Sequence, residues 1–372
     1  MQLPMQIPKT LLLCAALLLS QATSAGKPII YDTDMAIDDW LAMLYLAKHP
    51  DVDIVAVTIS ASGESHCRPG LDNVRNLLKL AGHEQVPVAC GDDYPLDGFF
   101  VFPEPWQVDS DTLSGIDLGR WVDEPVKGTQ SNGHAAELIH QVVNTSVEPV
   151  TLVAVGPLTN VAQWLGRYPD DRARVAELVM MGGSYQAPGN IIVPLFTKDH
   201  PNTVSEWNFF IDPVATRETL EAEGLERVMV GLDVTNRVRL THAFADDFKA
   251  RTRGPAAEFV DGVFDKNRWF IDSNEYYFWD VMAAVVTARP ELCQGDAIAL
   301  SAVDSPSGEP PYLGTSDLDM PATTVRGAPR RHLDAATAGQ VVRADQGPVT
   351  KVCTATDAEA VFAGFTATLT QQ

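Results

Sequence analysis

The sequence predicts an α/β fold: a single domain built on a mainly parallel, doubly wound (Rossmann-like) central sheet with helices on both faces. Short apolar runs typical of buried strands alternate with helical patterns along the chain, which indicates crossover connections between parallel strands. No linker rich in glycine, serine or proline and no run of like charges divides residues 26–372. We therefore expect one α/β domain over residues 26–372.

The expected elements follow one another in order. Four strand-like runs come after the first strand, which ends at Tyr31, and they are 53–59, 150–155, 178–181 and 227–230. The helical patterns are 72–81, 134–143, 159–166 and 213–223. The stretch 92–130 is rich in aspartate, glycine, proline and aromatic residues, which predicts a long loop near the active site.

Residues 1–25 have the features of an export signal peptide. Lys9 precedes an apolar stretch over 11–19, and small residues suited to cleavage follow at 22–25. The apolar stretch is too short to span a bilayer. We expect a periplasmic or secreted protein without a membrane anchor once the signal is removed.

The composition limits the kinds of molecule that the protein is expected to bind and the compartment that its cysteines suit. The chain has 27 basic and 49 acidic residues and a formal net charge of −22, which disfavours nucleic acid as a partner. Four cysteines remain once the signal is removed: Cys67, Cys90, Cys293 and Cys353. An oxidising compartment permits disulfides among them, and separate buried thiols are the alternative, because sequence does not fix the connectivity.

Four aspartates crowd together directly after the first apolar strand: Asp32, Asp34, Asp38 and Asp39. Carboxylates this close repel one another and lose hydration, so they persist where a bound cation neutralises them. Alternation along a strand places Asp32 and Asp34 on one side, and a helix begins at Asp38. Helix capping accounts for only one of these acids.

The ligand chemistry of this cluster favours calcium or magnesium. Both ions prefer carboxylate, carbonyl and water oxygens, and the sequence has no His/Cys cluster of zinc spacing. Calcium accepts crowded, irregular carboxylate sites more readily. A metal ion in this setting lowers the pKa of a bound water while a neighbouring carboxylate accepts the proton, which predicts hydrolysis.

Two later turns end expected strands. The segment 156–160 (Gly-Pro-Leu-Thr-Asn) joins a buried strand to a helix and places carbonyls and polar side chains at the strand end. A simple turn with Thr159 as helix cap is the alternative. The segment 181–183 (Met-Gly-Gly) ends another strand, and simple turn chemistry is again the alternative.

Two further segments carry acids. Glu206 and Asn208 alternate with aromatic residues, so a strand would place the acid and the amide on one face, where they suit the hydroxyls of a sugar. An exposed strand edge gives the same pattern. Asp280 precedes the apolar stretch 281–288 and opens a buried helix, for which an N-cap is the alternative.

Together these segments resemble the inosine-uridine-preferring nucleoside hydrolase family, from Ile29 to about Thr287. The acidic cluster is similar to the family signature Asp-Thr-Asp-x-Gly-x-Asp-Asp, with Ala36 where glycine is usual. The segments Gly-Pro-Leu-Thr-Asn, Met-Gly-Gly, Glu-x-Asn and an Asp before a helix then recur in the family's order. The resemblance implies hydrolysis of the N-glycosidic bond of ribonucleosides to free base and ribose.

The resemblance also implies a role for each matching residue. The cofactor would be Ca²⁺, held by Asp34, both oxygens of Asp39, the carbonyl of Thr159, and Asp280. Asp34 would also be the catalytic residue that takes a proton from the attacking water. The sugar would be bound by Asp38 at the 2' and 3' hydroxyls, by Asn190 and Asn208, and by Glu206 with Asn208 at the 5' hydroxyl. Asp32 would brace the cluster from behind, and a homodimer or homotetramer is implied by analogy.

Trp279 departs from many pyrimidine-accepting members of that family, in which a His before the last metal Asp protonates the leaving base. An indole cannot act as that acid, so Trp279 looks like the purine-preferring branch, where aromatic stacking assists departure of the base. Packing of Trp279 within its own loop is the alternative. A second stacking face would come from Tyr94, Trp106 or Trp269, which sequence does not rank. The resemblance thus favours purine ribonucleosides.

A second departure lies in the segment 62–67 (Ser-Gly-Glu-Ser-His-Cys), where the family commonly has Gly-Asn. Glu64 takes the place of that Asn near the metal and the ribose, and it adds a negative charge. His66 and Cys67 suggest a reactive pair by residue type only. Because adjacent residues need not face each other, we disfavour nucleophilic chemistry there.

Two other interpretations remain. The run 32–34 (Asp-Thr-Asp) also resembles the nucleophile and acid of a haloacid-dehalogenase-like phosphatase, whose Asp-x-Asp is followed by Gly-Thr instead of a paired Asp-Asp. A non-catalytic exported nucleoside-binding protein would keep the same pocket. Phosphate release from a nucleotide would support the first interpretation, and tight nucleoside binding without turnover would support the second.

Overall fold

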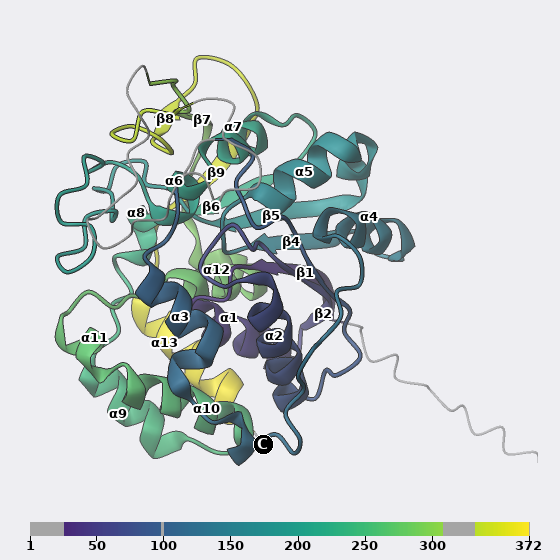
Figure 1. The fold of residues 1–372 in the computed structure, drawn as a ribbon, viewed down its shortest axis with the longest axis vertical. Helices are drawn as coiled ribbons and strands as arrows, with labels where there is room; N and C mark the ends of the chain where they lie inside the picture. Colours follow the sequence, from purple (N-terminus) through teal and green to yellow (C-terminus); the bar gives the residue numbers. More distant parts are fainter. Residues whose placement is uncertain (1–25, 98–99, 308–331, 372) are drawn as a thin grey trace, which may run out of the picture.

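A nine-stranded sheet in the order β3-β2-β1-β4-β5-β6-β9-β7-β8 forms the centre of the molecule (Figure 1). The computed structural model describes residues 26–97, 100–307 and 332–371, so the expected signal peptide (1–25) lies outside the described residues. The strands are β1 (Lys27–Thr33), β2 (Val52–Ile59), β3 (Val88–Cys90), β4 (Val150–Ala154), β5 (Val175–Met181), β6 (Arg227–Val230), β7 (Gln294–Ala302), β8 (Val341–Arg343) and β9 (Val349–Ala355).

Most strand pairs in this sheet are parallel, as predicted. Strands β1 to β6 pair in parallel, and β9 joins β6 in parallel; β7 runs antiparallel to both β9 and β8. The chain moves outward from β1 through β2 to β3, and then returns to β4 on the other side of β1. The carboxyl ends of β1 and β4 therefore flank the switch point, where open α/β sheets bind their ligands.

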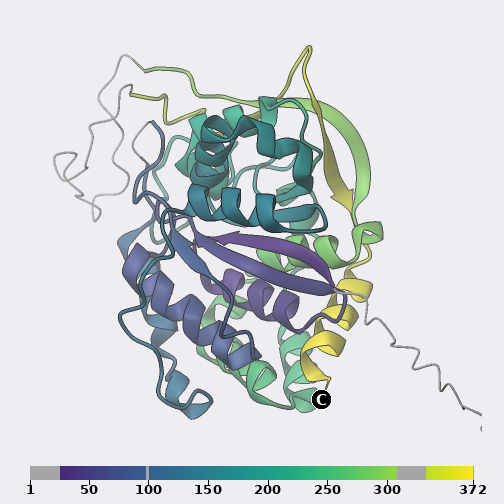
Figure 2. The same cartoon turned by 90° about the vertical axis from the view of Figure 1, so that its right-hand side faces the viewer.

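Helices cover both faces of the sheet (Figure 2). Alternate residues of β1 pack on opposite sides: Ile29 and Tyr31 belong to one buried cluster and Ile30 to another. The helices are α1 (Ile37–Lys48), α2 (Cys67–Ala81), α3 (Glu104–Thr112), α4 (Ala135–Thr145), α5 (Thr159–Arg167), α6 (Trp207–Ile211), α7 (Pro213–Glu221), α8 (Leu232–Thr235), α9 (His242–Arg251), α10 (Pro255–Lys266), α11 (Arg268–Asp272), α12 (Trp279–Ala288) and α13 (Ala358–Thr370). In the described ranges, no helix has the length and apolar character that crossing a membrane requires.

Two local predictions were wrong. The expected loop 92–130 contains helix α3 and two short 3₁₀ turns, Leu113–Gly115 and Leu118–Arg120. The expected strand around Glu206 is the start of α6, because Glu206 caps that helix by accepting hydrogen bonds from the amides of Asn208 and Phe209. The alternation of polar and aromatic residues here marks the start of a helix whose aromatic side chains are buried.

The structure pairs the four cysteines in two disulfides. Cys67 at the start of α2 is bonded to Cys90 at the end of β3, and Cys293 is bonded to Cys353 of β9. Cys67 is therefore not a free thiol. The imidazole of His66 instead lies 2.8 Å from the carboxylate of Asp111, so these two neighbours form no reactive pair.

Candidate active site

The turn after β1 is fixed by side-chain contacts. Met35 has a left-handed φ of 63°, a conformation that costs a non-glycine residue about 1–3 kcal/mol. Its amide donates to the hydroxyl of Thr33 at 3.0 Å and to Oδ1 of Asp39 at 3.2 Å. The indole of Trp40 donates to the Met35 carbonyl at 2.7 Å. These bonds hold the strained turn and return the chain so that Asp34 and Asp39 belong to one site.

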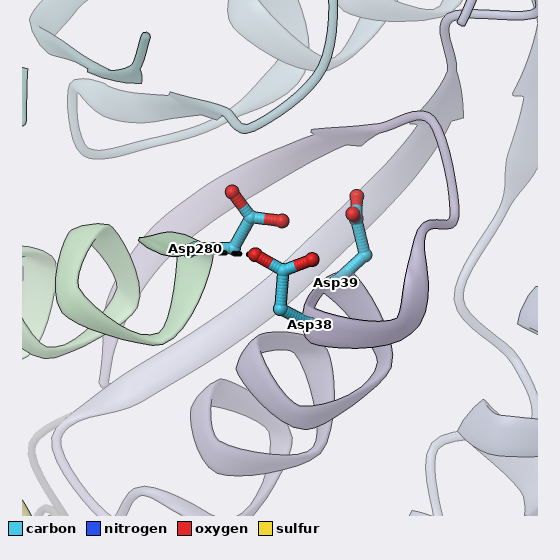
Figure 3. Close-up of side chains that lie close together, drawn as sticks. All are labelled: Asp38, Asp39 and Asp280. Atoms are coloured by element: carbon cyan, nitrogen blue, oxygen red, sulfur yellow. Dashed lines mark hydrogen bonds between the residues drawn. The ribbon is translucent and has the colours of Figure 1, made fainter. Parts of the chain in front are cut away.

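Three carboxylates meet where α1 packs against α12 (Figure 3). Asp38, Asp39 and Asp280 each place an oxygen so that all three atoms lie within 4.8 Å of one another. Asp38 also accepts a 3.2 Å hydrogen bond from the amide of Asp280. We call these three residues the acidic group. It joins the N-terminal signature to a residue more than two hundred positions later.

Helix capping does not explain these acids. The N-cap residues are Ala36 for α1, Leu158 for α5 and Phe278 for α12, and none of them makes a side-chain cap hydrogen bond. Asp38, Thr159 and Asp280 lie one or two positions further along the chain. The capping alternatives for these three residues are therefore wrong.

Asp34 lies beside the acidic group and is tightly enclosed. Its Oδ2 accepts a 3.0 Å hydrogen bond from the amide of Glu64. A Cβ on Gly63 would lie 2.2 Å from this oxygen, and one on Gly156 would lie 2.9 Å from the Asp34 Cβ, so glycine is needed at both places. The close group thus contains Asp38 where the predicted ligand set has Asp34, and the predicted ligand roles remain predictions.

Burial and mutual repulsion dominate the electrostatics of the site. Burial raises the pKa of Asp34 and of Asp280 well above the usual range, and neighbouring carboxylates add to the rise. Burial, with Asp39 nearby, raises the pKa of Asp38 to about 7. Burial also raises the pKa of Asp39. These four carboxyl groups cannot all be ionised at the same time unless a positive charge lies among them.

The acidic group fits a hard cation. The Oδ2 atom of Asp39 is buried and has no hydrogen-bond partner among the described residues, while its Oδ1 accepts from the hydroxyl of Thr33 and the amide of Met35. A buried, unpaired carboxylate oxygen is costly unless it binds a cation. The donors are carboxylate oxygens only, which suits calcium or magnesium better than zinc.

A hydrogen-bond network supports the acidic cluster from the turn that follows β4, the second of the two strands that flank the switch point. Asp32 is fully buried, and its Oδ1 accepts from the hydroxyl of Thr58 at 2.5 Å and from the carboxamide of Asn160 at 2.7 Å. The Thr159 hydroxyl donates to Asp212 at 2.7 Å and lies 2.8 Å from the Ser62 hydroxyl. These contacts tie Asp32 to β2 and α5 and fix the turn that carries Thr159, and the bracing role of Asp32 remains a prediction.

Two of the predicted sugar ligands, Glu206 and Asn208, lie at the start of α6. The two oxygens of Glu206 accept from three amides, those of Gly183, Asn208 and Phe209. Asn208 donates its side-chain nitrogen to the carbonyls of Val155 at 2.9 Å and Met181 at 3.3 Å. Its carboxamide therefore bridges the ends of β4 and β5. Burial raises the pKa of Glu206 to about 7, although these amides oppose the rise.

Asn190 reaches the same helix start from a loop. Its side-chain oxygen accepts from the amide of Trp207 at 3.2 Å, and its carbonyl accepts from the Trp207 indole at 3.1 Å. Asn190 thus contacts Trp207, the residue between Glu206 and Asn208. All three predicted sugar ligands are positioned by backbone contacts, and their contacts to a sugar remain predictions.

Trp279 belongs to an aromatic cluster at the start of α12. Its ring centroid lies 5.9 Å from Phe270, 5.9 Å from Tyr276 and 5.8 Å from Tyr277. Trp269 is stacked on Phe270 at 5.3 Å and is 56% exposed, so it joins this cluster. The half-buried Trp279 thus packs against its neighbours and directly precedes Asp280.

The other two candidate stacking residues differ from Trp269. Trp106 packs instead with Phe102, Phe196 and Trp207, in a separate aromatic cluster. Tyr94 is half-buried in the segment that follows β3. Of the three candidates, Trp269 is the one that shares a cluster with Trp279.

Sequence reasoning missed Tyr276. The residue is 1% exposed, and its buried hydroxyl has no hydrogen-bond partner within residues 26–97, 100–307 and 332–371. Burial, with the charges of Asp38 and Asp280 nearby, raises the pKa of this hydroxyl well above its usual value. The unpaired hydroxyl is therefore close to the acidic group. The available signal was its place in the aromatic run 276–279 directly before Asp280.

A family model for the inosine-uridine preferring nucleoside hydrolases matches residues 29–363. The chain belongs to this family. We expected the resemblance to weaken after about Thr287, but the match extends well beyond it. The reason is that β7, β9 and α13 complete the same sheet and core. This nucleoside hydrolase is an enzyme acting on N-glycosyl bonds, which excludes the phosphatase and the non-catalytic interpretations.

Similar proteins include bacterial hydrolases of stated specificity. The pyrimidine-specific ribonucleoside hydrolase RihA of Photobacterium profundum is 34% identical over 240 residues, covering 64% of this chain and 71% of that protein. RihA of Enterobacter sp. is 36% identical over 238 residues, covering 64% of this chain and 70% of that protein. The predicted purine preference thus differs from the specificity named for these relatives.

Solved structures agree on the fold. The inosine-uridine preferring nucleoside hydrolase of Bacillus anthracis superposes with a TM-score of 0.73 at 21% identity, covering 92% of this chain and 99% of that chain. The purine-preferring ribonucleoside hydrolase of Gardnerella vaginalis gives a TM-score of 0.68 at 20% identity, covering 92% and 98%. These likenesses confirm the predicted α/β fold.

Proposed function

We propose that this nucleoside hydrolase is an exported, calcium-dependent enzyme that cleaves purine ribonucleosides to free base and ribose. The observation that carries the metal dependence is the acidic group of Asp38, Asp39 and Asp280, with Asp34 beside it. Calcium is favoured because the donors are crowded carboxylates in an irregular arrangement. Here a bound cation would neutralise the cluster and lower the pKa of a coordinated water.

The residues of the chain supply the remaining steps. Asp34 accepts a proton from the attacking water, whose oxygen forms the new bond to the anomeric carbon; the bond to the base breaks, and the base leaves with its electron pair and takes a proton from solvent water. Positive charge develops on the ribose ring, and the carboxylates stabilise that state more than the neutral substrate. Asp38, Asn190, Glu206 and Asn208 hold the sugar hydroxyls and so orient the ring for attack.

The preference for purines rests on Trp279. It occupies the position directly before Asp280, and an indole can stack on a base but cannot protonate it. The larger purine ring gains more from stacking than a pyrimidine ring does. The pyrimidine specificity named for the RihA relatives makes uridine and cytidine the decisive competitors.

Export is supported by two features. Residues 1–25 have the composition of a signal peptide, and all four remaining cysteines are paired in disulfides. Disulfides persist in oxidising compartments such as the periplasm. Cell fractionation of a chain with and without residues 1–25 tests this: the full chain should be found outside the cytoplasm and the shortened chain inside.

A base-release assay tests the activity. Purified protein is given inosine, guanosine, adenosine, uridine or cytidine, with calcium or with a chelator. We expect faster release from the purine nucleosides, loss of release on chelation, and loss of turnover in Asp34→Asn. Equal or faster cleavage of uridine would refute the purine preference, and normal turnover by Asp34→Asn would show that another group accepts the proton.

A further inference from the structure

The segment 62–66 is held against Asp34 on one side. The amide of Glu64 donates to Oδ2 of Asp34 at 3.0 Å, and the amide of Ser65 donates to the Asp34 carbonyl at 2.8 Å. The backbone of Glu64 is therefore fixed at the active site. These contacts do not determine where its side-chain carboxyl points.

Helix α3 contacts the same segment from the other side, beside α2 (Figure 1). The hydroxyl of Ser110 donates to Oε2 of Glu64 at 2.9 Å. Ser110 is fully buried, and its carbonyl accepts a 3.1 Å hydrogen bond from the side chain of Asn73 on α2. The position of the Ser110 hydroxyl is therefore set by the packing of α3 on α2.

Other contacts join α3 to this segment without Ser110. Asp111 accepts from the hydroxyl of Ser65 at 3.1 Å and from the amide of His66 at 2.9 Å. Its other oxygen lies 2.8 Å from the His66 ring. The side chain of Gln107 donates to the carbonyl of Gly63 at 3.5 Å. Loss of the Ser110 hydroxyl would therefore leave the helix docked and free only the carboxyl of Glu64.

Glu64 borders the proposed reacting centre, because its amide donates to Oδ2 of Asp34 at 3.0 Å. Its charge acts on Asp34, and the charges of Asp38 and Asp39 act on it in turn. Ser110 bonds one of its oxygens, and a carboxyl has a second oxygen that can accept from a hydroxyl. Resting on the proposed hydrolysis of ribonucleosides, we propose that Ser110 is a positioning residue that aims Glu64 at a ribose hydroxyl of the substrate.

The test combines variants with substrates that lack single hydroxyls. The substrates are inosine and its 2'-, 3'- and 5'-deoxy analogues, and kcat and KM are measured separately. We expect Ser110→Ala to lower kcat/KM for inosine about tenfold. It should have no effect on the analogue that lacks the contacted hydroxyl, as in a double-mutant cycle. Ser110→Thr, which keeps the hydroxyl, should restore most of the loss.

Thr112→Ala is the matched control. Thr112 lies on the same helix and is exposed, and its hydroxyl donates to the carbonyl of Val108 in that helix, so its loss should leave the kinetics unchanged. Glu64→Gln keeps the shape of the carboxyl, and it should show its loss on the same substrates as Ser110→Ala. This second variant also decides the case if Ser110→Ala does not fold.

Three results would refute the inference or its basis. Wild-type kinetics in Ser110→Ala on inosine would show that the hydroxyl positions nothing. Equal losses on all four substrates, together with a lower melting temperature, would show a purely structural role. Failure of the wild-type protein to release base from any nucleoside would refute the proposed function itself, and with it the contact to ribose.

Discussion

The carboxylate of Asp38 accepts a hydrogen bond of 3.2 Å from the amide of Asp280, across 242 positions of sequence (Figure 3). This bond sets the N-terminal turn of α1 against that of α12 and so assembles the acidic group. The two helix starts bring their partial positive charge to the same place. That positive charge partly reduces the repulsion among the crowded carboxylates, and a cation would remove the rest.

Asp39→Asn tests the metal site. The variant replaces the buried, unpaired Oδ2 and removes one negative charge. We expect calcium affinity to fall by more than the roughly 10–100-fold that loss of an outer hydrogen-bonding partner costs. Titration calorimetry with calcium measures it. Asp53→Asn, on an exposed position of β2, is the control and should bind as the wild type does. Unchanged affinity in Asp39→Asn would remove this residue from the ligand set.

Tyr276→Phe tests the unpaired hydroxyl. Because this hydroxyl has no hydrogen-bond partner in the part of the chain that the structure describes, its removal breaks none of the observed bonds and the melting temperature should not fall. If the hydroxyl contacts substrate, kcat/KM should drop about tenfold, equivalent to about 1.4 kcal/mol. Thermal unfolding and steady-state kinetics with inosine measure the two effects. Unchanged kinetics would show that the hydroxyl meets no substrate atom.

Trp279→Leu tests base stacking. Aromatic contacts contribute about 0.5–1.5 kcal/mol beyond the area that they bury. We expect kcat/KM for inosine to fall roughly tenfold, and that for uridine to fall less. Competition between the two nucleosides gives the ratio directly. The same change at Trp269 shows whether this exposed ring is the second stacking face. Equal losses for inosine and uridine would support packing of the loop as the role of Trp279.

His66→Gln tests the contact of α3 at different pH values. The hydrogen bond to Asp111 raises the pKa of His66 above 6.5, although burial opposes the rise. The folded state thus binds the proton more tightly than the unfolded state does. The extra stability of the wild type should be fully present below pH 6.5 and lost as pH rises through the raised pKa.

The expected size of this effect is small. The His66 side chain is 61% exposed, so solvent screens the pair and its contribution should stay below about 1 kcal/mol. Urea unfolding at fixed calcium, at about pH 5.5 and about pH 8.5, measures the difference between wild type and variant. A difference that grows with pH would contradict the assignment.

Much of the fold could be predicted from the sequence. Buried strands such as β4 read as continuous apolar runs, and helices such as α7 carry a capping acid followed by proline, at Asp212 and Pro213. The alternation of these elements then fixes a parallel sheet. The capping role of Glu206 at the start of α6 was not recognised, because the aromatic residues that follow it are also typical of a strand.

The misses have a physical reason as well. Helix α6 has only five residues, all buried, so it shows no polar face from which a helical period could be read. Helix α3 also gave no signal, because it combines polar residues with one proline near its start. The link between Ser110 and Glu64 arises from the docking of α3 on α2. A contact of this kind depends on tertiary packing, which local sequence does not encode.

The place of β9 in the sheet bears on how the protein forms. This strand begins at Val349 and enters between β6 and β7, so β7 and β8 join the sheet only through it. The edge of β6 that pairs with β9 therefore stays unpaired during synthesis until β9 leaves the ribosome. An open edge invites pairing with other chains. Completion of the sheet is therefore a late event in folding.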